Sequence, residues 1–165
     1  DAATGNVLAP GKPGIVAVRG PNVFRGYWNL PEKTREDLRE DGTFLTGDIG
    51  VFSDDGYLTL VGRAKDLVIT GGFNVYPKEV EEVLDALPGV LESAVIGVPH
   101  PDFGEAVVAV LVPRPGESLD LAAIDAALRT QLARFKQPKR IEVVDALPRN
   151  TMGKVQKNVL RERFG

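Results

Sequence analysis

The sequence of 165 residues contains no cysteine, one histidine and one methionine. Without cysteine, the chain cannot form disulfide bonds, zinc sites with thiolate ligands or a cysteine nucleophile. A metal site built from several histidines is also excluded, because His100 is the only one. The absence of thiol chemistry fits a reducing compartment, and we expect a cytoplasmic protein.

Long apolar runs and a strong excess of one charge are missing as well. No run reaches the roughly 18 apolar residues that a membrane-spanning helix needs, and the opening residues lack the pattern of a secretory signal. The formal net charge of -3 argues against a general nucleic-acid binder, although local basic patches stay open. We therefore predict a globular protein with no membrane span and no nucleic-acid partner.

The opening of the chain does not resemble a translation start. It begins at Asp1 with the run DAATGNVLAPGKPG, and the only methionine is Met152. We therefore expect the chain to be a piece of a longer protein. A functional site would then be shared with residues outside it.

Residues 1–62 carry the pattern of β-structure. The run GIVAVRG alternates apolar and polar residues between glycines, as a strand does. The run GTFLTGDIGVFSDDGYLTLVG indicates strands joined by a turn, in which Gly56 can take a positive φ. Between the two runs, PEKTREDLRED is polar and predicts a short surface helix. We interpret this region as part of an incomplete β-barrel.

Residues 63–165 predict a small α+β domain of about 100 residues, which is a common domain size. The expected order is a hairpin around Gly71-Gly72, a helix from Pro77, two buried strands, a helix after Asp120, a short strand and a last helix. In that last helix, Lys157, Arg161 and Arg163 are expected on the polar side. The inward residues of the three helices are predicted to be Val80, Val83, Leu84 and Leu87; Leu121, Ile124, Leu128 and Leu132; and Val155, Val159 and Leu160. The fold class is therefore α+β, with a joint at residues 62–65.

Asp48, Arg63 and Lys65 are candidates for nucleotide binding near this joint. A carboxylate such as that of Asp48 can accept hydrogen bonds from the vicinal hydroxyls of a ribose. The donors of Arg63 suit a ribose hydroxyl or a phosphate, and Lys65 lies where the chain passes between domains. The alternatives are that Asp48 caps a turn, and that the run GRAKD is a solvated basic stretch with a local pair to Asp66.

Lys154 is the sharpest single candidate for catalysis. Gly153 gives the backbone before it freedom, and a lysine ammonium is a compact charge that stabilises phosphate oxygens. The alternative is an exposed lysine near a helix start, which the helix dipole mildly disfavours. Gly71-Gly72 permits close approach of a ligand but is equally expected in a plain hairpin. His100 and Glu105 are interpreted as structural residues.

The order of five runs is more specific than any of these residues alone. The runs are GYWNLPEKT, TGD, GRAKDLVITGGFNVYPKEVE, FKQPKRIEVVDALP and PRNTMGKVQK. In this order and spacing the sequence resembles the adenylate-forming superfamily, which includes acyl-CoA synthetases, luciferases and adenylation domains of peptide synthetases. The resemblance covers nearly the whole chain. It implies that residues 1–62 end an N-terminal domain and that residues 63–165 form a C-terminal lid domain.

The resemblance implies a reaction in two steps. ATP and a small carboxylic acid, with Mg²⁺, first form an acyl-adenylate and pyrophosphate; CoA then takes the acyl group and AMP leaves. Asp48 and Arg63 would hold the ribose hydroxyls, and Lys154 would contact the α-phosphate and the substrate carboxylate during adenylation. Lys65 would be the hinge about which the lid turns between the two steps.

The resemblance also implies residues for CoA. Gly71, Gly72 and Phe73 would line the path of its pantetheine arm. On a looser match, Arg129, Lys136 and Lys139 are candidates for its phosphates. The alternative for these three residues is that they are solvated charges near helix ends.

Within the superfamily, the run after the hinge resembles CoA ligases rather than peptide-synthetase adenylation domains. ITGGFNVYPKEVE and LPRNTMGKVQKNVLRE most resemble malonyl-CoA synthetases, which also accept methylmalonate. The phosphate loop, the adenine-binding segment and the Mg²⁺ ligands of the superfamily would lie upstream of residue 1, in the N-terminal domain of the same protein. We therefore expect the isolated chain to have no ligase activity.

Two other functions stay open. An adenylation domain that loads a carrier protein would transfer the acyl group to a protein-bound phosphopantetheine rather than to free CoA. A non-catalytic binding module would keep the fold but would not exchange pyrophosphate into ATP.

Overall fold

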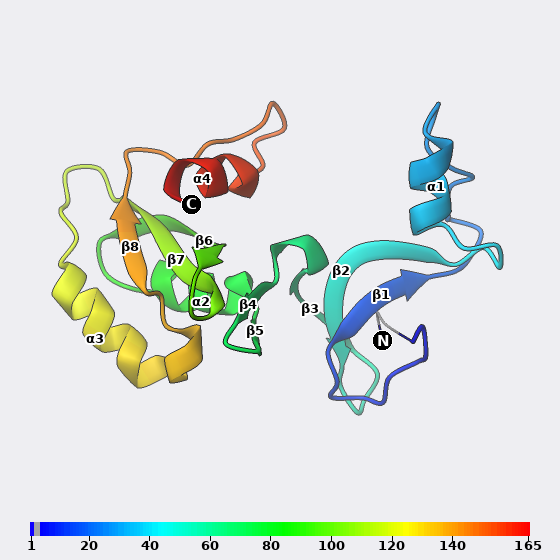
Figure 1. The fold of residues 1–165 in the computed structure, drawn as a ribbon, viewed down its shortest axis with the longest axis horizontal. Coiled ribbons are helices and arrows are strands. Elements are labelled where there is room, and N and C mark those ends of the chain that lie inside the picture. The colour runs from blue at the N-terminus through cyan, green and yellow to red at the C-terminus, as the bar shows by residue number, and fades with distance from the viewer. Residues whose placement is uncertain (2–3) are drawn as a thin grey trace. The chain divides into compact units, whose positions relative to one another are not determined.

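The computed structural model describes residue 1 and residues 4–165, which fold into two compact units, Asp1–Lys65 and Asp66–Gly165. Helices and strands occur in both units, so the predicted α+β fold class is confirmed (Figure 1). The predicted joint at residues 62–65 ends where the second unit begins. The assignment of the units to an N-terminal domain and a lid stays a prediction.

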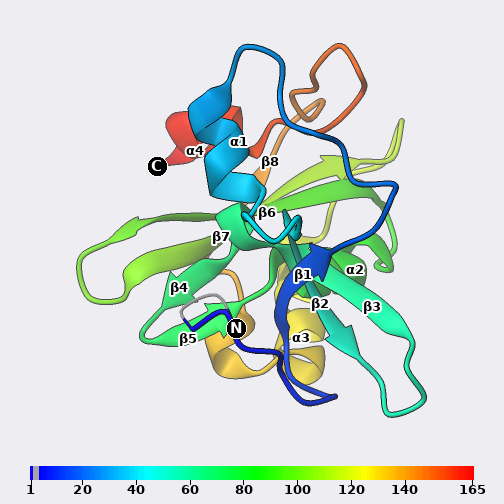
Figure 2. The ribbon, with the colours of Figure 1, turned by 90° about the vertical axis from the view of Figure 1, so that its right-hand side faces the viewer.

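The first unit holds an open antiparallel sheet of three strands in the order β1-β2-β3. The strands are β1 (Gly14–Val18), β2 (Phe44–Phe52) and β3 (Leu58–Arg63). The predicted turn joins β2 to β3, and Gly56 has a φ of 87° there. The expected surface helix is α1 (Pro31–Asp37), which has no buried residue and lies beyond one end of the sheet in Figures 1 and 2. Within the described residues, this sheet does not close into a barrel.

The second unit is built on a five-stranded sheet in which β7 has three neighbours. The order is β5-β4-β7-β6, and β8 pairs with β7 in parallel. These strands are β4 (Val68–Thr70), β5 (Phe73–Val75), β6 (Val90–His100), β7 (Gly104–Pro113) and β8 (Arg140–Val143). They correspond to the hairpin, the two buried strands and the short strand that the sequence predicts. The non-local pairing of β8 with β7 brings the C-terminal residues back to the sheet.

Three helices cover this sheet on its two faces: α2 (Pro77–Asp85), α3 (Leu121–Gln131) and α4 (Lys157–Phe164). Because successive strand residues point to opposite faces, Val107 and Ala109 of β7 pack with α2 and α3, whereas Ala106 and Val108 pack with Leu160 of α4. Figure 1 shows α3 and α4 on opposite sides of the sheet. Burial of both faces explains why β6 and β7 read as continuous apolar runs.

One predicted inward residue of α3 is wrong. Ile124 and Leu128 are buried as predicted, but Leu121 is 41% exposed. Asp120 caps the helix, with its Oδ1 accepting hydrogen bonds from the N–H groups of Ala122 and Ala123. Leu121 is therefore the first helical residue, and Leu119, before the cap, packs against the core.

The predicted polar side of α4 is also wrong for two of its three residues. Arg163 is exposed, but Lys157 and Arg161 are half-buried and pair with other elements. Nζ of Lys157 lies 2.6 Å from Oε1 of Glu81, and Nη2 of Arg161 lies 2.7 Å from Oδ1 of Asp66. Lys157 and Arg161 lie on the same face of the helix as the buried Leu160. Long basic side chains can lie along a packed surface while their charged ends pair with acids.

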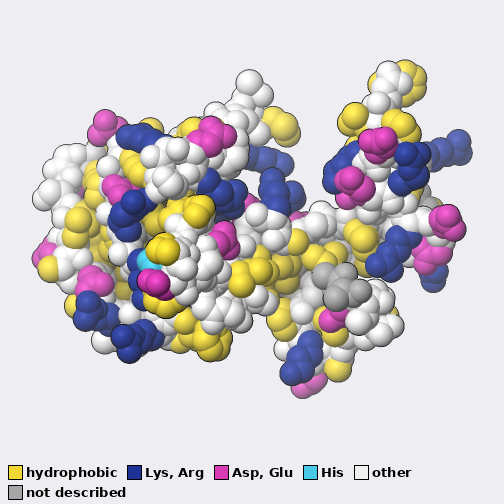
Figure 3. Space-filling model, viewed as in Figure 1, with side chains coloured by type: hydrophobic (Ala, Val, Ile, Leu, Met, Phe, Trp, Pro, Cys, Tyr) yellow, Lys and Arg dark blue, Asp and Glu magenta, His cyan; other side chains and the backbone are white. Residues whose placement is uncertain are grey.

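The surface carries charges of both signs. On the face shown in Figure 3, basic and acidic side chains are interspersed with apolar ones. In the part of the chain that the structure describes, no helix has the length and apolar character that crossing a membrane requires.

Candidate nucleotide and CoA site

Asp48 and Arg63 lie opposite each other on neighbouring strands of the first unit. The register pairs them across β2 and β3, and Nε of Arg63 lies 2.9 Å from Oδ1 of Asp48. Their side chains are 27% and 54% exposed, so a ligand can reach both. The carboxylate of Asp48 faces the guanidinium rather than capping a turn, and its second oxygen leaves capacity to accept hydrogen bonds. Both residues are candidates from the sequence, and the fold brings them together.

Lys65 ends the first unit in an exposed 3₁₀ turn (Ala64–Asp66). Its ammonium has no ion pair with any residue that the structure describes. The alternative of a local pair between this basic run and Asp66 is wrong, because Arg63 reaches Asp48 and Asp66 reaches Arg161. Lys65 is therefore exposed and has no ion pair among the described residues, whereas Arg63 and Asp66 near it are both paired.

Gly71 and Gly72 form the turn between β4 and β5. Their φ angles are 56° and 81°, in the left-handed region that favours glycine and suits a two-residue hairpin. The turn by itself therefore explains both glycines. Nothing lies within 4 Å of the position that a Cβ of Gly72 would occupy, so the backbone is also open to a ligand. Phe73 follows, half-exposed, and stacks on Phe135 with ring centroids 4.7 Å apart.

Lys154 lies in an exposed loop that leads into α4. Gly153 has a φ of 78°, and its N–H donates to the carbonyl of Asn150 at 2.9 Å, which closes a turn just before the lysine. Nζ of Lys154 has no partner among residue 1 and residues 4–165. The ammonium is therefore available to an anion, whereas the backbone that carries it is hydrogen-bonded.

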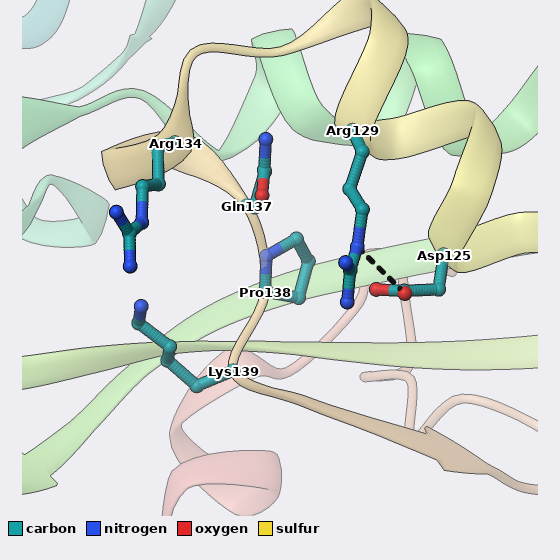
Figure 4. A pocket seen from close by; sticks show the side chains of 6 residues that line it. All are labelled: Asp125, Arg129, Arg134, Gln137, Pro138 and Lys139. Carbon is teal, nitrogen blue, oxygen red and sulfur yellow. Dashed lines mark ion pairs between the residues drawn. The ribbon is translucent and has the colours of Figure 1, made fainter.

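A basic cavity of about 530 Å³ lies between α3 and the segment that leads into β8. Figure 4 shows Arg134 and Lys139 with their charged ends directed toward each other, and Arg129 paired with Asp125 at 2.8 Å. Three basic side chains against one acid favour an anionic ligand. The residues that line the cavity are Asp125, Arg129, Arg134, Gln137, Pro138 and Lys139.

The fold does not bring Lys136 to this cavity. Its Nζ lies 2.5 Å from Oε1 of Glu79 at the start of α2, and 5.7 Å from the ring centroid of Phe135. Arg134, which sequence reasoning missed, lines the cavity instead. The two residues share one 3₁₀ turn (Arg134–Lys136), in which side chains two positions apart point in different directions. The run RFK contains both basic residues, so it could have suggested Arg134 as a candidate for CoA phosphate binding as readily as Lys136.

His100 and Glu105 have structural partners. Nδ1 of His100 accepts a hydrogen bond from the N–H of Asp102 at 3.2 Å within the β6–β7 turn. Oε2 of Glu105 accepts from the N–H of Ile69 at 2.7 Å and so ties β4 to β7. Both contacts shape the sheet edge near Gly71.

The described residues contain no cluster of side chains of the kind that binds a metal ion by itself. No group of three histidine, aspartate or glutamate side chains that could hold a metal ion occurs among them. Asp48, the acidic residue of the candidate nucleotide site, faces the guanidinium of Arg63 instead of a second carboxylate. Mg²⁺ takes oxygen ligands. The ligands that the resemblance implies for it stay predicted outside this chain.

Comparisons with known proteins bear on the whole chain. Residues 79–154 match the family model for the AMP-binding enzyme C-terminal domain. The chain is 48% identical over 162 residues to feruloyl-CoA synthase of an Amycolatopsis species, which covers 98% of the chain and 33% of that relative. It is 44% identical over 151 residues to the long-chain-fatty-acid–CoA ligase FadD13 of Mycobacterium tuberculosis, covering 92% of the chain and 30% of the ligase. The structure is similar to ATP-bound MatB from Rhodopseudomonas palustris, with a TM-score of 0.91, 59% identity, and coverage of 98% of this chain and 32% of that one.

The chain thus spans about a third of the length of these relatives. The family match lies wholly within the second unit, from Glu79 in α2 to Lys154. Residues 79–154 of the second unit therefore match the C-terminal domain of AMP-binding enzymes, which confirms the resemblance predicted from the ordered runs.

Proposed function

We propose that the chain is the C-terminal part of an AMP-forming ligase that joins a carboxylic acid to CoA. The acid and ATP form an acyl-adenylate and pyrophosphate, and the CoA sulfur then displaces AMP to give the thioester. The observation that carries the proposal is the exposed ammonium of Lys154, without a partner among the described residues, at the end of the family-matched segment. The CoA ligases among the relatives support the same reaction class.

Asp48 and Arg63 are proposed to hold the ribose of ATP. An ionised carboxylate accepts hydrogen bonds from both hydroxyls of a vicinal diol, and a guanidinium donates to one of them. Their pairing at 2.9 Å orients the carboxylate before the nucleotide arrives. Such preorientation reduces the entropy that is lost on binding.

Lys154 is proposed to stabilise the negative charge that develops during adenylation. The carboxylate oxygen attacks the α-phosphorus while pyrophosphate leaves, and a lysine ammonium at the α-phosphate offsets the charge on its oxygens. In the second step the sulfur attacks the acyl carbon, and this charge is no longer required. A lid that turns about Lys65 would present Lys154 in one position and the Gly71-Gly72-Phe73 turn in the other.

CoA is proposed to use two parts of the second unit. The open backbone of Gly72 beside the exposed ring of Phe73 suits the narrow pantetheine arm. The basic cavity with Arg129, Arg134 and Lys139 suits the phosphates of the nucleotide end. Lys136 stays a predicted CoA residue, although binding there would compete with its pair to Glu79.

Malonate or methylmalonate is the proposed acid, on the resemblance of residues 69–81 and 147–162 to malonyl-CoA synthetases. The relatives' names show why these residues are an indirect indicator: similar C-terminal parts serve a feruloyl-CoA synthase and a long-chain fatty-acid ligase. The residues that recognise the acid are proposed to lie outside this chain. The cytoplasm, where ATP and CoA are available, stays the predicted compartment.

The test uses the full-length protein. We expect pyrophosphate exchange into ATP that depends on malonate or methylmalonate, followed by thioester formation with free CoA. The 165-residue chain alone should release no pyrophosphate above the blank. Transfer only to a holo carrier protein would instead indicate a carrier-loading domain, and the absence of exchange with any carboxylic acid would indicate a non-catalytic module.

A further inference from the structure

Asn150 organises the backbone of the loop that carries Lys154. Its Oδ1 accepts hydrogen bonds from the N–H groups of Met152 at 3.0 Å and of Lys154 at 2.9 Å. Its own N–H donates to the carbonyl of Lys154 at 2.9 Å, and its carbonyl accepts from the N–H of Gly153 at 2.9 Å. The side chain and the backbone of one residue, Asn150, thus fix the backbone on both sides of the lysine Cα.

Arg149 fastens the same loop to the sheet. Its Nη1 donates to the carbonyl of Gly153 at 2.6 Å, and its Nη2 is ion-paired with Glu92 of β6. Arg149 also forms an isolated β-bridge with Val155, and Val155 packs against the core. The loop is therefore a small hairpin attached to the sheet rather than a free segment.

The helix after the loop is anchored as well. Leu160 of α4 is fully buried, and Lys157 and Arg161 pair with Glu81 and Asp66. The Glu81 carboxylate is itself held, because the same Oε1 accepts from the N–H of Val95 at 2.8 Å. Lys154 therefore lies between two anchored segments.

The side chain of Lys154 contrasts with this fixed backbone. Its Nζ has no ion pair or hydrogen bond to the described residues, although its N–H and carbonyl are both engaged. A flexible four-carbon stem on a fixed Cα can sweep only a limited volume. Fixing the Cα thus restricts where the ammonium can go, which is how supporting residues increase the precision of a reacting group.

We propose that Asn150 is a positioning residue for Lys154 in the adenylation step. It acts by holding the hairpin, so that the ammonium is presented at the α-phosphate, and it does not contact the nucleotide itself. The inference rests on the proposed role of Lys154. Because that role is confined to adenylation, loss of the Asn150 acceptor should impair the first half-reaction and spare the second.

The first test measures the hairpin without any reaction. Amide hydrogen exchange is followed by NMR in the 165-residue chain for Asn150→Ala, Asn150→Ser and the control Thr151→Ala. We expect the N–H of Lys154 to exchange about tenfold faster in Asn150→Ala, since one hydrogen bond is lost. Serine can replace part of the acceptor and should recover part of the protection. Thr151 is exposed and makes no side-chain hydrogen bond within residues 4–165, so its variant should match the wild type.

The second test separates the half-reactions in the full-length enzyme, with Lys154→Ala measured alongside. Asn150→Ala should lower the adenylation rate by about tenfold and leave thioester formation from supplied acyl-adenylate unchanged. Asn150→Ser should recover most of the adenylation rate.

The outcomes separate this inference from the proposed function. Unchanged exchange at Lys154 in Asn150→Ala overturns the hairpin role of Asn150. Faster exchange with normal adenylation, while Lys154→Ala is impaired, overturns the positioning role alone. Normal adenylation by Lys154→Ala overturns the proposed role of Lys154 and the positioning role with it, and the exchange rates then still decide whether Asn150 holds the hairpin.

Discussion

Arg63 and Asp48 form an ion pair across two neighbouring strands, with Nε and Oδ1 2.9 Å apart, although both side chains are accessible to solvent. An exposed pair of this kind contributes only about 0–1 kcal/mol to stability. Stability alone therefore gives little reason for it. Its geometry instead suits a guanidinium that holds the Asp48 carboxylate in one orientation, in which the carboxylate could accept hydrogen bonds from the ribose diol.

This relationship predicts a separation between stability and nucleotide binding. Asp48→Ala should change the free energy of unfolding of the 165-residue chain by at most about 1 kcal/mol. In the full-length enzyme it should raise the KM for ATP by about tenfold or more, because hydrogen bonds to a charged group are lost. Glu36→Ala, which removes an exposed acid of α1 that pairs with Lys33, is the matched control. An unchanged KM for ATP in Asp48→Ala would exclude the ribose role.

The pair between Glu81 and Lys157 predicts the opposite behaviour. Their side chains are only 12% and 18% exposed, and Glu81 also accepts from the N–H of Val95. Glu81→Ala leaves a half-buried ammonium and a buried N–H without partners, and should destabilise the chain by about 3 kcal/mol. Urea unfolding measures this loss.

The control for that experiment lies on the same helix. Glu82 pairs with Lys78 at 3.9 Å, and its side chain is 65% exposed. Glu82→Ala should change the unfolding free energy by no more than about 0.5 kcal/mol. Similar losses for the two variants would contradict the anchoring of α4 by Glu81.

Local pattern was enough to predict most elements of the second unit. The glycine pair indicates the β4–β5 turn, Pro77 marks the start of α2, and Asp120 caps α3. The continuous apolar runs indicate β6 and β7, since both of their faces are covered. Each of these signals depends on neighbouring residues alone.

The long-range contacts could not be predicted in this way. The partners of Lys157 and Arg161 are 76 and 95 positions away, so no local pattern indicates that these side chains are held. Arg134 is a different case, because Arg129 and Lys139, with which it lines the cavity, are close to it in the sequence. The pattern did not indicate which side chain of the Arg134–Lys136 turn faces that cavity. At the candidate site, the residue types of Asp48, Arg63 and Lys154 made them candidates but left structural alternatives open, and the resemblance of the ordered runs favoured the functional interpretation, which stays a prediction.

The basic cavity predicts a defect specific to the nucleotide end of CoA. Arg134→Ala and Lys139→Ala should each raise the KM for CoA by about five- to thirtyfold, as one charge-assisted contact of about 1–2 kcal/mol is lost. With pantetheine, which lacks the phosphates, both variants should react like the wild type. Arg114→Ala, at an exposed basic residue outside the cavity, is the control. An equal loss of activity with CoA and with pantetheine would show that the CoA phosphates do not bind in this cavity.

The central measurement compares the two half-reactions of Lys154→Ala in the full-length enzyme. Pyrophosphate release reports adenylation, and thioester formation from supplied acyl-adenylate and CoA reports the second step. We predict that adenylation falls by about a hundredfold or more, the effect of removing one charge-stabilising donor, while thioester formation stays within about twofold of the wild type. Equal losses in both half-reactions, or normal adenylation, would contradict a lysine that acts on the phosphate in the first step only.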